Sequence, residues 1–267
     1  MQAINVPPTD THSGYTLFQC ACGYSYTEGY PSCQEHVAGQ GVITKMPTES
    51  QSGNIVYSCL HCGEFLREET LPSIGEHRKQ CPSASYVDTP SYLHWAHDGI
   101  DKCLVEGLFR GLDEGHFDPN GAMTRAMMVV VLWRLEGCPR VSSPSSFPDV
   151  VPYAWYADAV AWAQGMGIVN GMDDGTFSPL ARITREQIVT ILYRYRTLGS
   201  DREPPSQEVL KKFPDASSIS DYAKEAFAWA VHKGYIFGMS EQGRVLLAPK
   251  ETATRAQAAT LFTRLPR

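Results

Sequence analysis

Apolar side chains recur with helical spacing in three places along this 267-residue chain, each time directly after a Thr-Arg pair. The spacing is i, i+3, i+4, i+7, which is typical of a helix with one buried face. The apolar positions are Met128, Val131, Leu132 and Leu135, then Ile188, Ile191, Leu192 and Tyr195, then Ala258, Leu261, Phe262 and Leu265. Two more helices are predicted at 155–167 and 221–234, and each ends in Gly, as helices commonly do.

The loops that precede the three Thr-Arg helices repeat as well. Each has two glycines four residues apart and a proline five residues before the threonine. The glycine pairs are Gly107 and Gly111, Gly167 and Gly171, and Gly234 and Gly238. The chain thus contains one helix-loop-helix unit three times. A single unit cannot bury its apolar face alone, whereas three can form a compact pseudo-threefold core. We therefore predict a mainly α fold for this part.

The arginine of the repeated pair lies where a helix disfavours a cation. Thr184 is predicted to cap its helix and Gln187 to complete a capping box. Arg125, Arg185 and Arg255 then fall in a first turn, where the helix dipole makes a cation unfavourable by roughly 0.3–1 kcal/mol. A solvated surface arginine, or one paired with an acidic neighbour, would explain a single instance. The threefold recurrence favours an anion site, in which free helix N–H groups and a guanidinium bind a carboxylate or phosphate.

Two aromatic residues and two acidic loops are further candidates. Trp95 and Trp155 begin the first helix of copies one and two, where a flat ring could stack on a sugar, and Tyr222 takes this position in copy three. The alternative for the tryptophans is packing in the core. The loops at 112–118 and 172–178 invite a calcium interpretation, but neither supplies the closing Glu, so glycine turns are predicted instead.

Residues 84–267 resemble a trio of S-layer homology domains, with repeats at 84–140, 147–200 and 213–267. The matching motifs are "FPD…W", the loop "G…DGTF.P" and the signatures "TRAM", "TREQ" and "TRAQ". The resemblance implies an all-helical, three-pronged module that anchors bacterial surface proteins non-covalently to the cell wall. Its ligand in that family is a secondary cell wall polysaccharide, often with ketal-linked pyruvate, which would supply the carboxylate.

The resemblance also implies which residues contact the polysaccharide. They are the arginines Arg125, Arg185 and Arg255, the glycines Gly111, Gly171 and Gly238, the acids Asp88, Asp149 and Asp215, and the aromatics Trp95 and Trp155. None of the three signatures keeps the family's terminal Glu. Copy three lacks both the tryptophan and "DGTF". We therefore expect binding in the grooves fed by copies one and two, with the third degenerate.

Residues 1–82 form a separate Cys-rich region, which holds six of the eight cysteines. Aromatic and β-branched runs lead into two knuckle-like motifs, "CACG" and "CLHCG", which predicts short strands and two zinc-ribbon-like modules. The two four-ligand sets are Cys20, Cys22, Cys33 and His36, and Cys59, Cys62, His77 and Cys81. Four protein ligands would make the zinc structural. The alternative is disulfide bonding. Cys103 and Cys138 are predicted to be buried thiols, with pairing to each other as the alternative.

The overall composition and net charge limit the class of protein. A composition of 43% hydrophobic and 19% charged residues is typical of a globular protein, and the net charge of -6 argues against nucleic-acid partners and anionic membranes. No apolar run is long enough to insert into a membrane. The first residues do not resemble a signal peptide, which conflicts with export unless the chain is trimmed or part of a longer precursor.

We therefore expect a cell-surface binding module, not an enzyme. The alternatives are a zinc-dependent cell-wall hydrolase, for which "HExxH" and "GxSxG" motifs are missing, and a peptidoglycan-binding module. A nucleic-acid reader using the zinc modules is disfavoured by the acidity. The Cys-rich region would be a spacer, a passenger or a binding surface for a protein partner.

Overall fold

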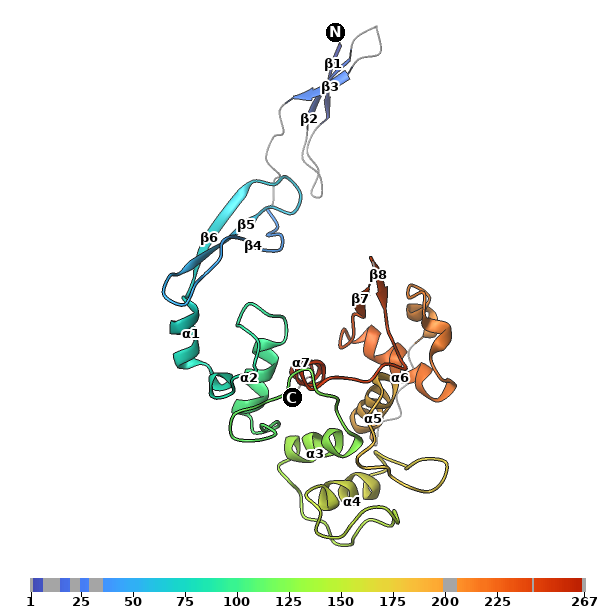
Figure 1. Cartoon of the computed structure of the whole chain (residues 1–267). Helices are drawn as coiled ribbons and strands as arrows, with labels where there is room; N and C mark the ends of the chain where they lie inside the picture. The colour runs from blue at the N-terminus through green and yellow to red at the C-terminus, as the bar shows by residue number, and fades with distance from the viewer. Residues whose placement is uncertain are drawn as a thin grey trace. The chain divides into compact units, whose positions relative to one another are not determined.

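The computed structural model describes residues 2–6, 15–19, 25–28, 36–198, 206–241 and 243–265, with side chains from residue 36 onward. The chain divides into two compact units, Met1–Gln80 and Cys81–Arg267 (Figure 1).

The first unit contains two three-stranded antiparallel sheets and one short helix. The sheet order is β1-β2-β3 in the first and β4-β5-β6 in the second. The elements are β1 (Gln2–Val6), β2 (Tyr15–Gln19), β3 (Ser25–Glu28), β4 (Val42–Lys45), β5 (Gly53–Ser58), β6 (Phe65–Leu71) and α1 (Ile74–Gln80). The strands β2 and β5 coincide with the two runs that the sequence predicts to lead into the cysteine motifs.

The described side chains of this unit form almost no apolar core. Between residues 36 and 80 the buried residues are Pro47, Gly53, Cys59 and Ser73. Large apolar side chains such as Val42, Met46 and Phe65 are instead exposed. A sheet of this size needs an apolar face or another constraint to be stable by itself.

The second unit is a helical assembly of the three repeats. Its α-helices are α2 (His97–Val105), α3 (Arg125–Leu135), α4 (Ala157–Gly165), α5 (Arg185–Thr197), α6 (Asp221–His232) and α7 (Arg255–Thr263). Short 3-10 helices are η1 (Pro82–Ser85), η2 (Gln207–Leu210) and η3 (Ala216–Ser218), and one hairpin is formed by β7 (Met239–Glu241) and β8 (Arg244–Leu246). The predicted mainly α fold of this part is confirmed.

Helices of different repeats pack against each other. α4 of the second repeat packs on α3 of the first, α6 of the third packs on α5 of the second, and α2 of the first packs on α7 of the third (Figure 1). The apolar core between them includes Phe117, Phe177 and Phe227, all fully buried. Each repeat therefore buries its apolar stripe against a neighbour in a closed cycle.

The loops before the Thr-Arg helices also close a cycle. The Met123 amide donates to the Ala253 carbonyl at 2.9 Å, the Ile183 amide to the Met123 carbonyl at 2.9 Å, and the Ala253 amide to the Ile183 carbonyl at 3.1 Å. These three residues are buried, one from each repeat. The hydrogen bonds bring the three helix starts together.

Candidate functional site

The three helix starts are capped as the sequence predicts. The Thr124, Thr184 and Thr254 hydroxyls each accept the backbone N–H three residues on, at 3.2–3.3 Å. The predicted capping box of Thr184 and Gln187 is confirmed, and α7 has a second one.

The first-turn amides already have partners. In α3 the Arg125 amide donates to the Ala181 carbonyl at 3.0 Å, and the Ala126 amide to the Pro179 carbonyl at 2.9 Å. The matching bonds in the other two helices run from Arg185 to Glu251, Glu186 to Pro249, Arg255 to Gly121 and Ala256 to Pro119. The expectation of free N–H groups for an anion is therefore wrong. The next repeat supplies the carbonyls, a long-range contact that local sequence does not reveal.

The arginine side chains complete the same cycle. The Nε–H of Arg125 donates to the Phe177 carbonyl at 2.7 Å, and that of Arg255 to the Phe117 carbonyl at 2.7 Å. Arg185 donates in the same way to Leu247 at 2.9 Å. Arg125 and Arg255 are only 5% and 4% exposed. Burial lowers the pKa of all three guanidinium groups, although arginine stays charged. The solvated-surface alternative is wrong for Arg125 and Arg255, which are buried, and all three arginines join two repeats.

The three predicted acids hold the loops that receive these arginines. Each carboxylate accepts two consecutive backbone N–H groups of its own repeat at 2.7–3.0 Å. The pairs are Asp88 with Phe117 and Asp118, Asp149 with Phe177 and Ser178, and Asp215 with Leu247 and Ala248. The second residue of each pair has positive φ, an unfavourable conformation that these bonds offset. The acids therefore position the loop carbonyl that each arginine contacts.

The predicted aromatic positions lie on the surface. Trp95 is 59% exposed, Trp155 57% and Tyr222 54%, so the core-packing alternative is wrong for the tryptophans. The Tyr222 hydroxyl donates to Glu186 Oε1 at 3.0 Å. Exposed indole rings of this kind are available to stack on a ligand.

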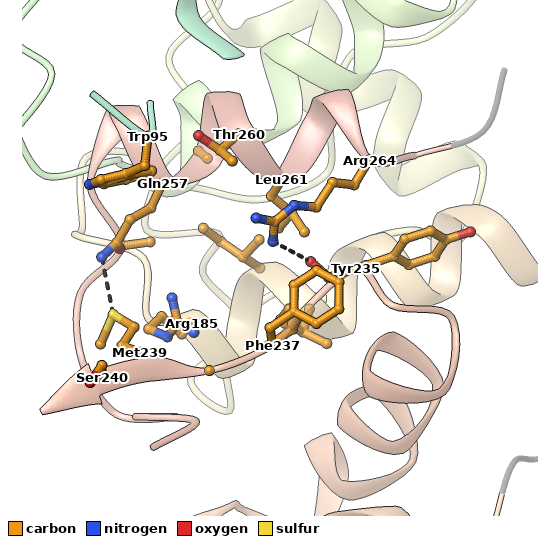
Figure 2. Close-up of a pocket in the computed structure, with 16 residues that line it drawn as sticks. Trp95, Arg185, Tyr235, Phe237, Met239, Ser240, Gln257, Thr260, Leu261 and Arg264 are labelled. Carbon is orange, nitrogen blue, oxygen red and sulfur yellow. Dashed lines mark hydrogen bonds between the residues drawn. The ribbon is translucent and has the colours of Figure 1, made fainter. Parts of the chain in front are cut away.

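A groove of about 580 Å³ brings these features together (Figure 2). Trp95 of the first repeat, Arg185 of the second and Gly238 of the third all line it. Arg264 adds a second cation, whose guanidinium lies 5.0 Å from the centre of the Phe237 ring. In Figure 2, Arg185 lies below Trp95, and Arg264 extends toward the Phe237 side. The first repeat supplies Trp95 and the second supplies Arg185, whereas the third repeat forms most of the wall of the groove.

Three glycines shape the loops that precede the Thr-Arg helices, and Gly238 among them lines the groove. Gly238 has a φ of 88°, and a Cβ there would lie 2.6 Å from Val245 Cγ1, so the hairpin of β7 and β8 requires glycine. The Gly111 amide donates to the Tyr86 hydroxyl at 3.0 Å. At Gly171, with a φ of 78°, a Cβ would lie 2.5 Å from the Phe147 ring.

The acidic loops and the two later cysteines have structural environments. Asp113 Oδ1 accepts the Gly115 and His116 amides, both at 2.8 Å, as expected for a turn. Asp174 Oδ1 accepts the Thr176 amide at 2.9 Å. Cys103 is buried, as predicted, whereas Cys138 is exposed, and neither is in a disulfide.

The predicted metal ligands group differently from their sequence spacing. In the first unit, His36 joins Cys59 and Cys62, with ligand atoms within 4.8 Å of one another. In the second unit, Cys81 lies with His97 and Asp101. The expected set of Cys59, Cys62, His77 and Cys81 is thus corrected. Its spacing suggested a finger, but the extended seven-residue strand β6 runs between Cys62 and His77.

The disulfide alternative does not hold for the described cysteines of this region, because Cys59, Cys62 and Cys81 are thiols. Cys20, Cys22 and Cys33 lie outside the described residues. His97 and Asp101 were missed by sequence reasoning. Their i, i+4 spacing on α2 was the available signal.

The fold is a helical repeat module with a groove on its surface. None of the described helices has the length and apolar character of a membrane span. The S-layer homology domain family matches at residues 85–127, 146–189 and 212–259. The chain belongs to this family, which places it at the bacterial cell surface among anchoring domains.

Several curated proteins are similar to part of this chain. An exoglucanase XynX of Acetivibrio thermocellus is 32% identical over 170 residues, 63% of this chain and 15% of that protein. The surface-layer 125 kDa protein of Lysinibacillus sphaericus is 28% identical over 64% of this chain and 14% of its own length. A cellulosome-anchoring protein of A. thermocellus is 27% identical over 59% and 35%. The match thus spans well under half of these relatives.

One solved structure, an undecaheme cytochrome from the S-layer of Carboxydothermus ferrireducens, gives a TM-score of 0.30 at 18% identity, over 54% of this chain and 21% of that one.

Proposed function

We propose that this chain anchors a protein to the cell wall by binding an anionic secondary cell wall polysaccharide, one that carries pyruvate. The observation that carries the proposal is the groove of Figure 2, where the exposed Trp95 ring and the Arg185 guanidinium line one cavity of about 580 Å³. A sugar ring and an attached carboxylate need these two groups together.

The arginines would serve both structure and binding. In Arg185 the Nε–H is bonded to the Leu247 carbonyl, which fixes the plane of the guanidinium. Its Nη groups are then the donors left for a ligand carboxylate, in the forked geometry that carboxylates favour. Arg264 adds a second positive charge to the same groove. Because Arg185 is already ordered, little entropy is lost when the ligand binds.

We infer a pseudo-threefold module with three related grooves. The cycle of hydrogen bonds supports this, since each arginine contacts the loop of the next repeat. Each groove would combine the aromatic residue of one repeat, the arginine of the next and the glycine loop of the third. The sets are Trp95, Arg185 and Gly238; Trp155, Arg255 and Gly111; and Tyr222, Arg125 and Gly171. In the second set, Arg255 Nη2 already donates to the Arg110 carbonyl at 2.7 Å, so we rank the first groove highest.

Co-sedimentation with purified sacculi tests the proposal, before and after chemical removal of their secondary polymer. We expect the native chain to pellet only with intact sacculi. Trp95→Ala should weaken binding about fivefold, since stacking on an aromatic ring contributes on the order of 1 kcal/mol. Tyr153→Ala is the matched control, because Tyr153 is fully exposed and does not line the groove.

The other outcomes separate the alternatives. Pelleting that survives polymer removal and Trp95→Ala would overturn the groove assignment and favour peptidoglycan as the ligand. Release of soluble sugar from sacculi by the purified chain would favour the hydrolase. The remainder of the relatives, outside the match, is consistent with an anchor that carries a passenger, and the first unit is our candidate passenger or spacer.

We also propose a zinc ion in the first unit, held by His36, Cys59 and Cys62 and by a fourth ligand that would make the site structural. Cys62 Sγ lies 3.5 Å from His36 Nδ1. Burial tends to raise the pKa of the Cys59 thiol, but the amides of Cys62 and His61, together with the side chains of His36 and Cys62, lower it to about 5. A thiolate is the form of cysteine that binds zinc. The ion would compensate for the small number of buried apolar side chains between residues 36 and 80.

A further inference from the structure

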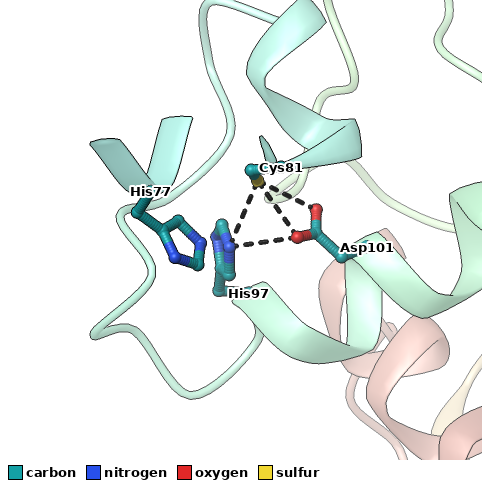
Figure 3. Close-up of side chains that lie close together, drawn as sticks. All are labelled: His77, Cys81, His97 and Asp101. Carbon is teal, nitrogen blue, oxygen red and sulfur yellow. Dashed lines mark hydrogen bonds and ion pairs between the residues drawn. The ribbon is translucent and has the colours of Figure 1, made fainter. Parts of the chain in front are cut away.

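A second cluster of metal-binding side chains lies at the start of the first repeat (Figure 3). Cys81 Sγ is 3.3 Å from His97 Nε2 and 3.0 Å from Asp101 Oδ2. His97 Nε2 is 3.2 Å from the same Asp101 oxygen. A sulfur, a nitrogen and an oxygen thus face one point from three sides.

The surroundings hold these three groups in a ligand-like orientation. His97 is 3% exposed, and its Nδ1 lies 2.9 Å from the Pro90 carbonyl, so Nδ1 carries the proton and Nε2 offers its lone pair. The Ser83 amide donates to Asp101 Oδ1 at 3.0 Å, which orients the carboxylate. Metal-binding histidines and carboxylates have this kind of supporting hydrogen bond.

The other two repeats lack this cluster. When Trp95 is aligned with Trp155, His97 and Asp101 correspond to Ala157 and Ala161. In the third repeat the same alignment gives Lys224 and Ala228. The repeat architecture therefore does not need polar groups here. Buried polar groups are costly unless they find partners, so their presence in one repeat calls for its own explanation.

We propose that Cys81, His97 and Asp101 bind a zinc-like divalent cation that fastens the loop before α2 to that helix. Ligand atoms of a tetrahedral zinc ion lie roughly 3.2–3.8 Å apart, so the observed separations need to open by only a few tenths of an ångström. A fourth ligand would complete the tetrahedron.

The ion would order the segment of chain that contributes Trp95 to the groove of Figure 2. The chain between Cys81 and His97 includes Asp88, which orders the loop carbonyl bonded to Arg255, and Trp95 of the groove. A cation that ties both ends of this segment together would restrict its motion. The site is independent of the polysaccharide proposal, since it makes no use of the groove itself.

A hydrogen-bonded cluster without an ion is the competing explanation. In that state the Cys81 thiol donates to Asp101, and burial raises the pKa of the thiol. Metal content of the full chain distinguishes the two states. Stripped protein is reloaded with Co²⁺, and bound metal and the thiolate-to-cobalt absorption band are measured per chain. We expect Cys81→Ser and Asp101→Asn each to lose one equivalent relative to the native chain.

Two variants serve as controls for the measurement of metal content. Cys138→Ser removes an exposed cysteine of the same unit and should keep all the metal. Asp101→Asn retains an acceptor for the Ser83 amide, so it tests the site even if Cys81→Ser fails to fold, with helical circular dichroism as the check. Equal metal content in the native chain and in folded Asp101→Asn, with an unchanged charge-transfer band, would overturn the proposal.

Discussion

The two units of this chain differ in the interactions that stabilise each of them. The second unit buries a continuous apolar core, including Phe117, Phe177 and Phe227, and closes it with hydrogen bonds that run from repeat to repeat. In the first unit, by contrast, no large aliphatic or aromatic side chain between residues 36 and 80 is buried. Hydrophobic burial therefore stabilises the second unit, whereas residues 36–80 of the first unit need another source of stability.

Metal removal should give the largest difference between the units. With a chelator present, we expect β4, β5 and β6 to lose hydrogen-exchange protection, because structural zinc contributes on the order of 10 kcal/mol in small domains. The helices α3 to α7 should keep theirs. Segment-resolved hydrogen exchange measures both. Unchanged protection of the strands in metal-free protein would show that the first unit is stable without an ion.

Removing one arginine of the cycle should destabilise the second unit alone. In Arg255→Ala the carbonyls of Phe117 and Arg110 lose a charged donor. We expect the free energy of unfolding to fall by about 2–4 kcal/mol, since hydrogen bonds to charged groups contribute about 1.5–3 kcal/mol each, not fully additively. Urea unfolding followed by helical circular dichroism measures this loss.

The exposed Arg182 provides the control for this experiment. Arg182→Ala should change stability by less than about 0.5 kcal/mol, as is usual for surface substitutions. An equally small effect of Arg255→Ala would mean that the arginine cycle does not stabilise the fold, and that these residues serve the ligand alone.

The arginines also show what the sequence could predict and what it could not. The caps, helices and apolar stripes follow from local rules, so Thr184, Gln187 and the Ile188 stripe could be predicted from their neighbours. The partners of Arg125 and Arg255 could not, because the carbonyls of Phe177 and Phe117 come from other repeats, 52 and 138 residues away. The regular spacing in the sequence identified the repeated arginines, but only the structure shows which carbonyls they contact.

The metal ligands show the same limit. Sequence spacing grouped Cys81 with Cys59 and Cys62, because knuckle motifs are recognised by short separations. The partners of Cys81 in the second unit, His97 and Asp101, lie 16 and 20 residues further on, and the turn of the chain around η1 brings them together. Spacing rules do not predict such a turn.

Within the second unit, substitutions at two glycines can distinguish the cost of backbone strain from the cost of steric crowding. Gly238 lies in the wall of the groove, and Gly175 does not. Gly238 and Gly175 both have positive φ, 88° and 80°. At Gly238 a Cβ would lie 2.6 Å from Val245 Cγ1 and 2.9 Å from the Leu246 carbonyl, whereas at Gly175 it would meet nothing within 4 Å. We expect Gly175→Ala to cost about 1 kcal/mol and Gly238→Ala roughly twice that, by urea unfolding. Equal losses of unfolding free energy in the two variants would mean that the hairpin of β7 and β8 shifts easily to make room for a Cβ.

The smallest expected effect concerns a buried carboxylate that is specific to the second repeat. Glu186 is 5% exposed and accepts hydrogen bonds from Lys250, Ser220 and Tyr222. Burial alone would raise its pKa, but these donors hold the pKa below its usual value. A carboxyl with a lowered pKa stabilises the fold above its unfolded pKa, and that contribution is lost as the pH falls through the folded pKa.

Lys250→Met should therefore lower the free energy of unfolding at pH 6, and the loss should shrink as the pH falls through the folded pKa of Glu186 and the carboxyl takes up a proton. The loss at pH 6 should stay below about 1 kcal/mol, because the Lys250 ammonium is itself half exposed. Lys211→Met, which removes a surface pair with Glu208, is the matched control and should have no comparable effect at pH 6. A Lys250→Met loss that stays the same throughout the acid titration would show that the lysine acts through packing of its stem rather than through its charge.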